Sequence, residues 1–221
     1  LPLGKVCFRA DNPSLDALVQ VAADAGLGSA IFVDLAVTSA DTAMNLPDKY
    51  ASHVVHWGLQ PGESFQVFEA IATAFAERNP PVPFSLVADT PEALGAMLRN
   101  GAGHSASSIT LRSDAPSPEL LAAFTSAAQT AGYERFPLHV LGRGINGDGP
   151  GSAARLIRNL IVFASCGVAQ ADIDGTLLFH EREVAEAYVF LSALARRLVE
   201  AVPIGTLNVP APYRALVFRI E

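Results

Sequence analysis

The residues of this chain that could do chemistry follow apolar, strand-like runs. Arg9 lies in the run Lys5–Ala10, and Gln60 comes three residues after the run His53–Trp57. Asp172 and Asp174 lie at and just beyond the end of a later apolar run. A carboxyl group can exchange protons and a guanidinium can pair with an anion, whereas an amide only forms hydrogen bonds because it does not titrate. The pattern indicates a polar site where strand ends meet, with few groups suited to acid–base chemistry.

Strand-like and helix-like segments alternate along the whole chain. Ser14 is a predicted N-cap and Gly26 a predicted helix stop. Strands are expected at Lys5–Ala10, Ala30–Leu35, His53–Trp57, Pro83–Val87, Ser108–Leu111, Pro137–Leu141, and at either Ile161–Ala164 or Val168–Ile173. Helices are expected at Ser14–Ala25, Ser64–Arg78, Pro91–Arg99, Pro118–Ala131, from Ser152 toward Asn159, and at Val184–Glu200. Such repeats predict an α/β fold of the TIM type, a (β/α) barrel of parallel strands. Seven units leave this barrel one strand short of eight.

Composition narrows the classes of partner. The 221 residues are 50% apolar and 17% charged, which predicts a sizeable core. A net charge of −7 without a run of Lys or Arg argues against nucleic acid as a partner. No apolar run is long enough to span a bilayer. Cys7 and Cys166 are expected to be buried free thiols, so cysteine usage leaves both an exported or periplasmic and a cytoplasmic location open.

Two segments carry a family resemblance. Trp57-Gly58-Leu59-Gln60-Pro61 and the run Pro137–Gly144 resemble the ends of strands four and seven in the clan of glycoside hydrolases built on (β/α)8 barrels. In that clan these strands end in the acid/base Glu of an Asn-Glu-Pro motif and in a nucleophilic Glu. Here the matching positions hold Gln60 and Gly142. Because retaining hydrolysis needs two carboxyl groups, the resemblance implies a barrel that has lost its catalysis.

The resemblance also sets a register and a role. Arg9 matches an Arg at the end of strand two, so residues 1–202 correspond to a barrel from strand two onward. Residues 203–221 correspond to the start of a β-rich tail or a closing strand. The role implied is a carbohydrate-binding or structural component of a larger complex, with another protein chain or domain as partner and no cofactor.

Two other functions remain open on the residues. The glycine-rich loop 142–151, with Arg143, could bind the phosphate of a substrate ahead of a helix beginning at Ser152, as in phosphosugar isomerases or aldolases built on barrels. Only two lysines, Lys5 and Lys49, occur in the chain, and neither lies convincingly at a strand end. Alternatively, a glycosidase could have moved its carboxylates to Glu63, Asp172 or Asp174.

The remaining candidates have structural alternatives of equal or greater weight. Trp57 could stack on a sugar or simply pack in the core. His139 could share a cavity with His53 and His56, but three histidines without fixed spacing do not predict a metal site. Glu63 most simply interacts with a helix N-terminus. The ligand-binding candidates are therefore Arg9, Trp57, Gln60, Glu63, His139, Arg143, Asp172 and Asp174, with an enzymatic role less favoured than a binding role.

Overall fold

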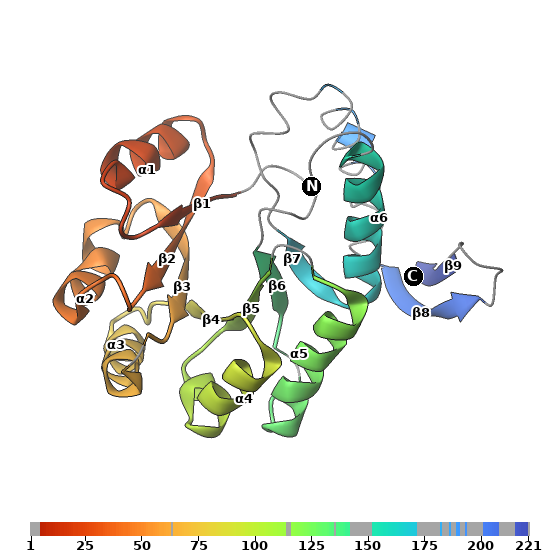
Figure 1. Cartoon of the computed structure of the whole chain (residues 1–221). Coiled ribbons are helices and arrows are strands. Elements are labelled where there is room, and N and C mark those ends of the chain that lie inside the picture. Colours follow the sequence, from red (N-terminus) through yellow and green to blue (C-terminus); the bar gives the residue numbers. More distant parts are fainter. Residues whose placement is uncertain are drawn as a thin grey trace. The chain divides into compact units, whose positions relative to one another are not determined.

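The computed structural model describes residues 5–62, 64–113, 116–134, 136–141, 152–171, 201–207 and 215–220, together with helical positions 182, 186, 189, 190 and 193. Its parallel strands are β1 (Lys5–Arg9), β2 (Gly28–Asp34), β3 (Val54–Gln60), β4 (Phe84–Ala88), β5 (Ser108–Arg112), β6 (Leu138–Leu141) and β7 (Val168–Ala171). The helices between them are α1 (Leu15–Asp24), α2 (Ala40–Lys49), α3 (Phe65–Glu77), α4 (Pro91–Arg99), α5 (Pro118–Thr130) and α6 (Ser152–Ser165), with a short 3₁₀ helix η1 at Ala102–His104 (Figure 1).

The strands of the main sheet follow one another in chain order, from β1 to β7. Every described pairing in this sheet is parallel. A doubly wound sheet would reverse its strand order at a switch point, and no reversal occurs here. The prediction of a (β/α) barrel-type fold is confirmed. The described residues form seven of its parallel strands, where a complete barrel has eight.

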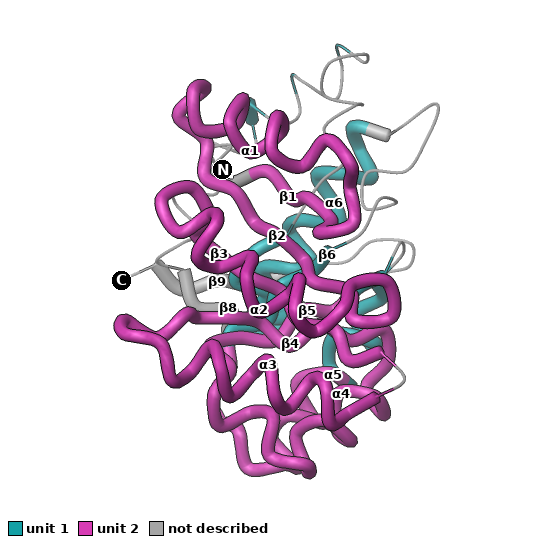
Figure 2. Tube along the Cα trace, turned by 90° about the vertical axis from the view of Figure 1, so that its left-hand side faces the viewer, with its two compact units in different colours: residues 1–2, 112–123, 137–221 teal, residues 3–111, 124–136 magenta. Residues whose placement is uncertain are grey.

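The chain divides into two compact units, coloured separately in Figure 2. The larger unit spans residues 3–111 and 124–136 and contains β1 to β5 with α1 to α4. The other contains residues 1–2, 112–123 and 137–221, with β6, β7 and α6. In this second unit the backbone N–H of Ser113 donates to the carbonyl of Leu141 over 3.0 Å.

One face of the larger unit's sheet carries the aromatic core. The register aligns Ile31 with Trp57 and Trp57 with Phe84 on neighbouring strands. Phe75 of α3 meets the rings of Trp57 and Phe84 edge-on, at centroid distances of 5.9 and 6.1 Å. Edge-on pairs of this kind add to the stabilisation from burial alone. All five residues of β4 are buried, as expected for a strand covered on both faces.

Helix ends follow local sequence in some places and not in others. Thr90 caps α4 by accepting from the backbone N–H of Ala93 over 3.2 Å, with Pro91 as its first residue. Ser39 caps α2 in the same way through Thr42. Ser14 occupies the N-cap position of α1, but its side chain forms no capping hydrogen bond.

The sequence did not predict α2, which contains Pro47. Its buried face holds only Ala43, Leu46 and Pro47, and a proline lowers any expectation of helix from sequence. The alternative strand Ile161–Ala164 is also wrong, because those residues belong to α6 and the strand is β7. Most of the helix predicted at residues 184–200 lies outside the described residues.

Strands β8 (Ala201–Leu207) and β9 (Ala215–Ile220) form a separate antiparallel pair. The predicted domain boundary at residue 202 stays a prediction. Among the described residues, no helix is long and apolar enough to cross a membrane.

Candidate functional site

The carboxyl ends of β1 to β4 carry a row of polar side chains, which we call the strand-end row and define as Arg9, Asp34, Gln60 and Asp89. Arg9, Asp34 and Gln60 are the last residues of β1, β2 and β3, and Asp89 directly follows β4. The pairing of Asp34 with Gln60 places their side chains on the same face. In α/β sheets and barrels, ligands bind at this edge because the loops that follow the strands surround it.

Arg9 is held between two carboxylates. Its Nε lies 3.0 Å from Oδ1 of Asp11, and its Nη2 lies 3.1 Å from Oδ2 of Asp11 and 3.3 Å from Oδ2 of Asp34. The other oxygen of Asp34 accepts from the backbone N–H of Ala36 over 3.1 Å. Hydrogen bonding to Asp11 raises the pKa of Arg9, and the same bond lowers the pKa of Asp11. These hydrogen bonds fix the orientation of the guanidinium, while the Arg9 side chain stays half exposed.

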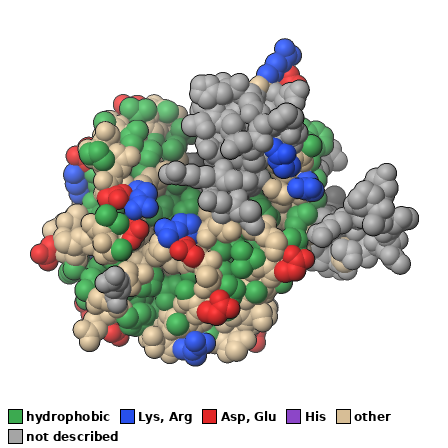
Figure 3. All heavy atoms as spheres, in the orientation of Figure 1, with side chains coloured by type: hydrophobic (Ala, Val, Ile, Leu, Met, Phe, Trp, Pro, Cys, Tyr) green, Lys and Arg blue, Asp and Glu red, His purple; other side chains and the backbone are tan. Residues whose placement is uncertain are grey.

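Gln60 and Asp89 form the second half of the row. The amide Nε2 of Gln60 donates to Oδ2 of Asp89 over 3.5 Å, a long hydrogen bond. Asp89 is exposed and Gln60 is partly exposed. The row therefore presents a guanidinium, an amide and two carboxylates over four neighbouring strands. On the face shown in Figure 3, Lys and Arg side chains lie next to Asp and Glu side chains.

Small residues line the same face of the sheet below the row. The hydroxyls of Ser85 and Thr110, from β4 and β5, share a 2.7 Å hydrogen bond and are buried. A Cβ added at Gly58 would lie 2.0 Å from the ring of Phe32, so the ring of Phe32 crosses β3 at this glycine. Gly58 is thus required by close packing.

The structure brings together only part of the predicted set. Arg9 and Gln60 lie in the strand-end row. Trp57 is 4% exposed and packs against Phe75, so its ring belongs to the core. His139 lies in β6 and is partly exposed. Glu63, Gly142, Arg143, Asp172 and Asp174 lie outside the described residues, and their predicted roles stay predictions.

Sequence reasoning missed three carboxylates at this edge: Asp11, Asp34 and Asp89. A signal was present, because the segments AIFVD and SLVAD each end an apolar strand on an aspartate. Asp34 lies within the predicted strand Ala30–Leu35, but the sequence analysis gives it no role in a site. Among the described residues, no group of three or more His, Cys, Asp or Glu side chains is arranged to hold a metal ion.

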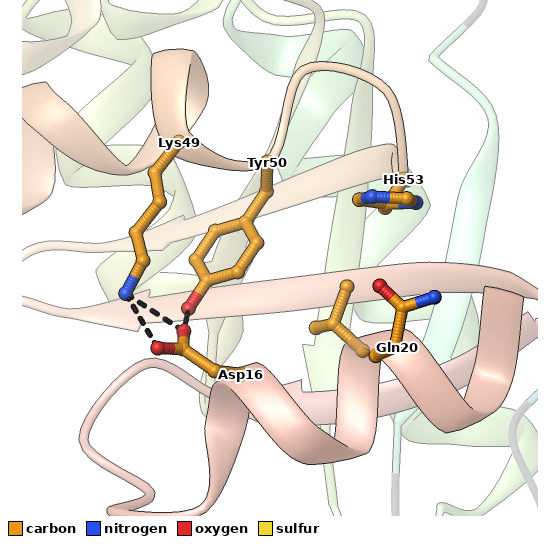
Figure 4. A pocket seen from close by; sticks show the side chains of 6 residues that line it. Asp16, Gln20, Lys49, Tyr50 and His53 are labelled. Carbon is orange, nitrogen blue, oxygen red and sulfur yellow. Dashed lines mark hydrogen bonds and ion pairs between the residues drawn. The ribbon is translucent and has the colours of Figure 1, made fainter.

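A pocket of about 190 Å³ lies away from the row, between α1 and the segment that joins α2 to β3 (Figure 4). It is lined by Asp16, Val19, Gln20, Lys49, Tyr50 and His53. The ammonium of Lys49 lies 2.7 and 2.9 Å from the two oxygens of Asp16, and the hydroxyl of Tyr50 donates to the same carboxylate. Lys49 also lies 5.1 Å from the centre of the Tyr50 ring.

The fold and the strand-end row define an α/β protein of the (β/α) barrel type with polar groups at the carboxyl edge of its sheet. No family model matches the chain, and no curated protein matches it. Among solved structures, a Schiff-base-forming fructose-1,6-bisphosphate aldolase is similar, with 14% sequence identity and a TM-score of 0.48. The match covers 86% of this chain and 92% of that chain.

The predicted membership in the glycoside hydrolase clan is wrong. No family model matches the chain, so no family evidence supports membership in that clan. The residues that suggested the resemblance have packing explanations. Trp57 fills the core against Phe75, and Gly58 makes room for the ring of Phe32. A strand that ends in a glycine-containing turn before a helix is common to parallel α/β repeats and carries no family information.

Proposed function

We propose that this protein is a barrel-type enzyme of the phosphosugar isomerase or aldolase kind, with its substrate bound at the strand-end row. The observation that supports the proposal is the alignment of Arg9, Asp34, Gln60 and Asp89 on four consecutive strand ends. Carboxylates and an amide can accept and donate hydrogen bonds to several hydroxyls at once, which suits a polyhydroxylated substrate. The guanidinium of Arg9 suits an anionic group on that substrate.

In this proposal the carboxylates of the strand-end row transfer the protons. Isomerisation between a hydroxyaldehyde and a hydroxyketone requires a base that moves a proton from the hydroxyl-bearing carbon to the carbonyl carbon, while a second proton moves from the hydroxyl oxygen to the carbonyl oxygen. Asp89 is the candidate base, since it is exposed at a strand end and hydrogen-bonded by Gln60. Asp34 would hold Arg9 in place, since Arg9 and the N–H of Ala36 engage its two oxygens. The glycine-rich loop 142–151, with Arg143, lies outside the described residues, and its role in binding a phosphate stays a prediction.

A Schiff-base route receives no support from the lysines. Lys5 is the first residue of β1, at the opposite end of the strand from the row. Lys49 is the last residue of α2 and is paired with Asp16. Any aldol chemistry in this proposal therefore uses acid–base groups instead of a lysine imine.

The test measures binding and turnover with the full chain. Glucose 6-phosphate and fructose 6-phosphate should raise its melting temperature, because a ligand that binds only the folded state stabilises it. Interconversion should be detectable for at least one aldose–ketose phosphate pair. Asp89→Asn should abolish turnover and keep binding, whereas Asp24→Asn, the same change on the exposed end of α1, should leave both unchanged.

Two outcomes would contradict the proposal. If a broad panel of sugar phosphates neither stabilises the protein nor turns over, the function is wrong. If unphosphorylated glucose and fructose bind as well as their phosphates, the row is a neutral sugar site and the phosphosugar class is wrong. Turnover that survives Asp89→Asn would remove Asp89 from its catalytic role and leave the substrate class standing.

A further inference from the structure

The pocket shown in Figure 4 collects hydrogen-bonding groups that the proposed function does not use. In Figure 4 the polar ends of Lys49 and Tyr50 point toward Asp16, and the side chains of Gln20 and His53 lie on the other side of Tyr50. Val19, which is 1% exposed, contributes an apolar side chain to the lining. The pocket belongs entirely to the larger unit and contains no residue of the strand-end row.

The charged groups of the pocket retain capacity for a ligand. The ammonium of Lys49 has three N–H donors. Two of them face the two oxygens of Asp16, so the third can donate to a ligand. A carboxylate has about four acceptor positions, and Asp16 receives Lys49 and Tyr50. The side chains of Lys49 and Asp16 are 56% and 68% exposed, so their ion pair is weak and can share its partners at little cost.

Both groups are also held in their charged forms. Hydrogen bonds from Lys49 and Tyr50 lower the pKa of the Asp16 carboxyl. Hydrogen bonding to Asp16 raises the pKa of Lys49. The pocket thus offers one negative and one positive charge side by side, with a net charge of zero.

Uncharged hydrogen-bonding groups complete the lining. Nε2 of Gln20 donates to Oδ1 of Asp24 over 2.7 Å. This bond does not use the amide oxygen of Gln20, which could accept a hydrogen bond from a ligand. The imidazole of His53 faces the pocket from the segment before β3. These two groups can contact the middle of a ligand whose charged ends engage Asp16 and Lys49.

We propose that this pocket binds a small zwitterion of the amino-acid type. Its ammonium would pair with Asp16 and its carboxylate with Lys49, and the rest of the ligand would lie near Val19 and the imidazole of His53. A ligand with a single charge would engage only one member of the pair. A single water needs about 10–15 Å³ of such space, so a pocket of about 190 Å³ that is open to solvent admits a ligand as small as alanine.

Binding is tested by titrating the full chain with L-alanine, with acetate and methylammonium as probes that each carry one of its two charges. The ring protons of the histidines and the melting temperature are followed during the titration. We expect alanine to shift the His53 signals saturably and to bind at least tenfold more tightly than acetate or methylammonium.

Two variants with matched controls assign the site. Lys49→Gln and His53→Ala should each weaken alanine binding at least tenfold. Arg182→Gln breaks the surface ion pair with Glu186, and His104→Ala removes a histidine bonded to Tyr133; neither residue lines the pocket, so both should bind alanine normally. His53→Ala leaves the contacts of Asp16, Lys49 and Tyr50 in place, so it tests binding even if Lys49→Gln loosens the fold.

The proposal is overturned if alanine causes no saturable change at His53. It is also overturned if acetate or methylammonium binds as tightly as alanine, because the pocket would then not recognise a zwitterion. Equal effects of the control variants and the pocket variants would place the binding elsewhere. None of these outcomes bears on the sugar phosphate titrations, which depend on the strand-end row.

Discussion

The packing around Gly58 shows how one residue constrains the candidate site. Gly58 lies in β3 two residues before Gln60, and the ring of Phe32 crosses the strand there. A side chain at this position would displace Phe32, which lies two residues before Asp34 on β2. The glycine therefore helps to set the positions from which Asp34 and Gln60 leave their strands.

We expect Gly58→Ala to destabilise the protein by about 1–3 kcal/mol, the usual cost of forcing extra atoms into a packed site. The new Cβ would lie 2.0 Å from Cδ1 of Phe32 and 3.0 Å from Cγ2 of Val87. Gly95→Ala is the matched control, since its Cβ would meet only the flexible end of Arg99 inside α4. That change should stabilise the protein by about 0.5–1 kcal/mol, because alanine favours a helix. Urea denaturation of both variants measures the difference, and a neutral Gly58→Ala would contradict the packing argument.

At the scale of single elements, the helix caps give a second comparison. Thr90→Ala should cost about 1 kcal/mol, because its hydroxyl accepts the N–H of Ala93 at the start of α4. Ser14→Ala should cost only a few tenths of a kcal/mol, since the Ser14 side chain forms no capping bond in α1. Chemical denaturation under identical conditions compares the two. Equal losses would mean that Ser14 caps α1 in solution.

The contact between α1 and the end of α2 gives stability that depends on pH. Because Lys49 and Tyr50 lower the pKa of Asp16 in the folded chain, this contribution is present above the ordinary carboxyl pKa of 3.8. It is lost as the pH falls through the lowered value. Wild type should therefore lose more stability than Asp16→Asn between pH 5 and the onset of acid unfolding. Parallel slopes of unfolding free energy against pH for the two proteins would exclude this role for Asp16.

The elements also show how far sequence reasoning reached. The period of apolar residues predicted β1 to β6 and most of the helices, because parallel strands covered by helices need continuous apolar runs. It missed α2, in which Pro47 and the small number of large apolar residues weaken the helical signal. The sequence also leaves two roles open for Trp57, sugar stacking in a site and packing in the core. Strand alternation alone does not say which face of the strand meets the helices. The contact with Phe75 decides that question only in three dimensions.

The sequence predicts that polar residues gather at the strand ends, but it identifies only some of the residues in the strand-end row. Arg9 and Gln60 were identified as candidates, while Asp34 and Asp89 were not. The family resemblance points to carboxylates after later strands, whereas the described carboxylates follow β1, end β2 and follow β4. Register between neighbouring strands brings these residues together, and a single sequence does not specify register.

At the scale of the whole molecule, protection of the backbone should differ between strands of the same sheet. All five residues of β4 are buried, and β4 pairs with β3 on one side and β5 on the other. In the described sheet, β1 is an end strand that pairs only with β2, and Val6, Cys7 and Phe8 are partly exposed. Amides open with free energies that range from near zero at frayed edges to the global value in the core.

Hydrogen exchange followed by mass spectrometry should therefore rank the peptides, after correction for intrinsic rates. Peptides from β4 should exchange most slowly, and β1 should exchange faster than β2, which has strands on both sides. The edge matters because Arg9 ends β1, so opening of this strand would displace the guanidinium from Asp34. A sugar phosphate that binds the strand-end row should slow exchange in β1 more than in β4. Protection of β1 equal to that of β4 without any ligand would show that the edge of β1 left unpaired among the described strands is covered in solution, as the predicted protein partner requires.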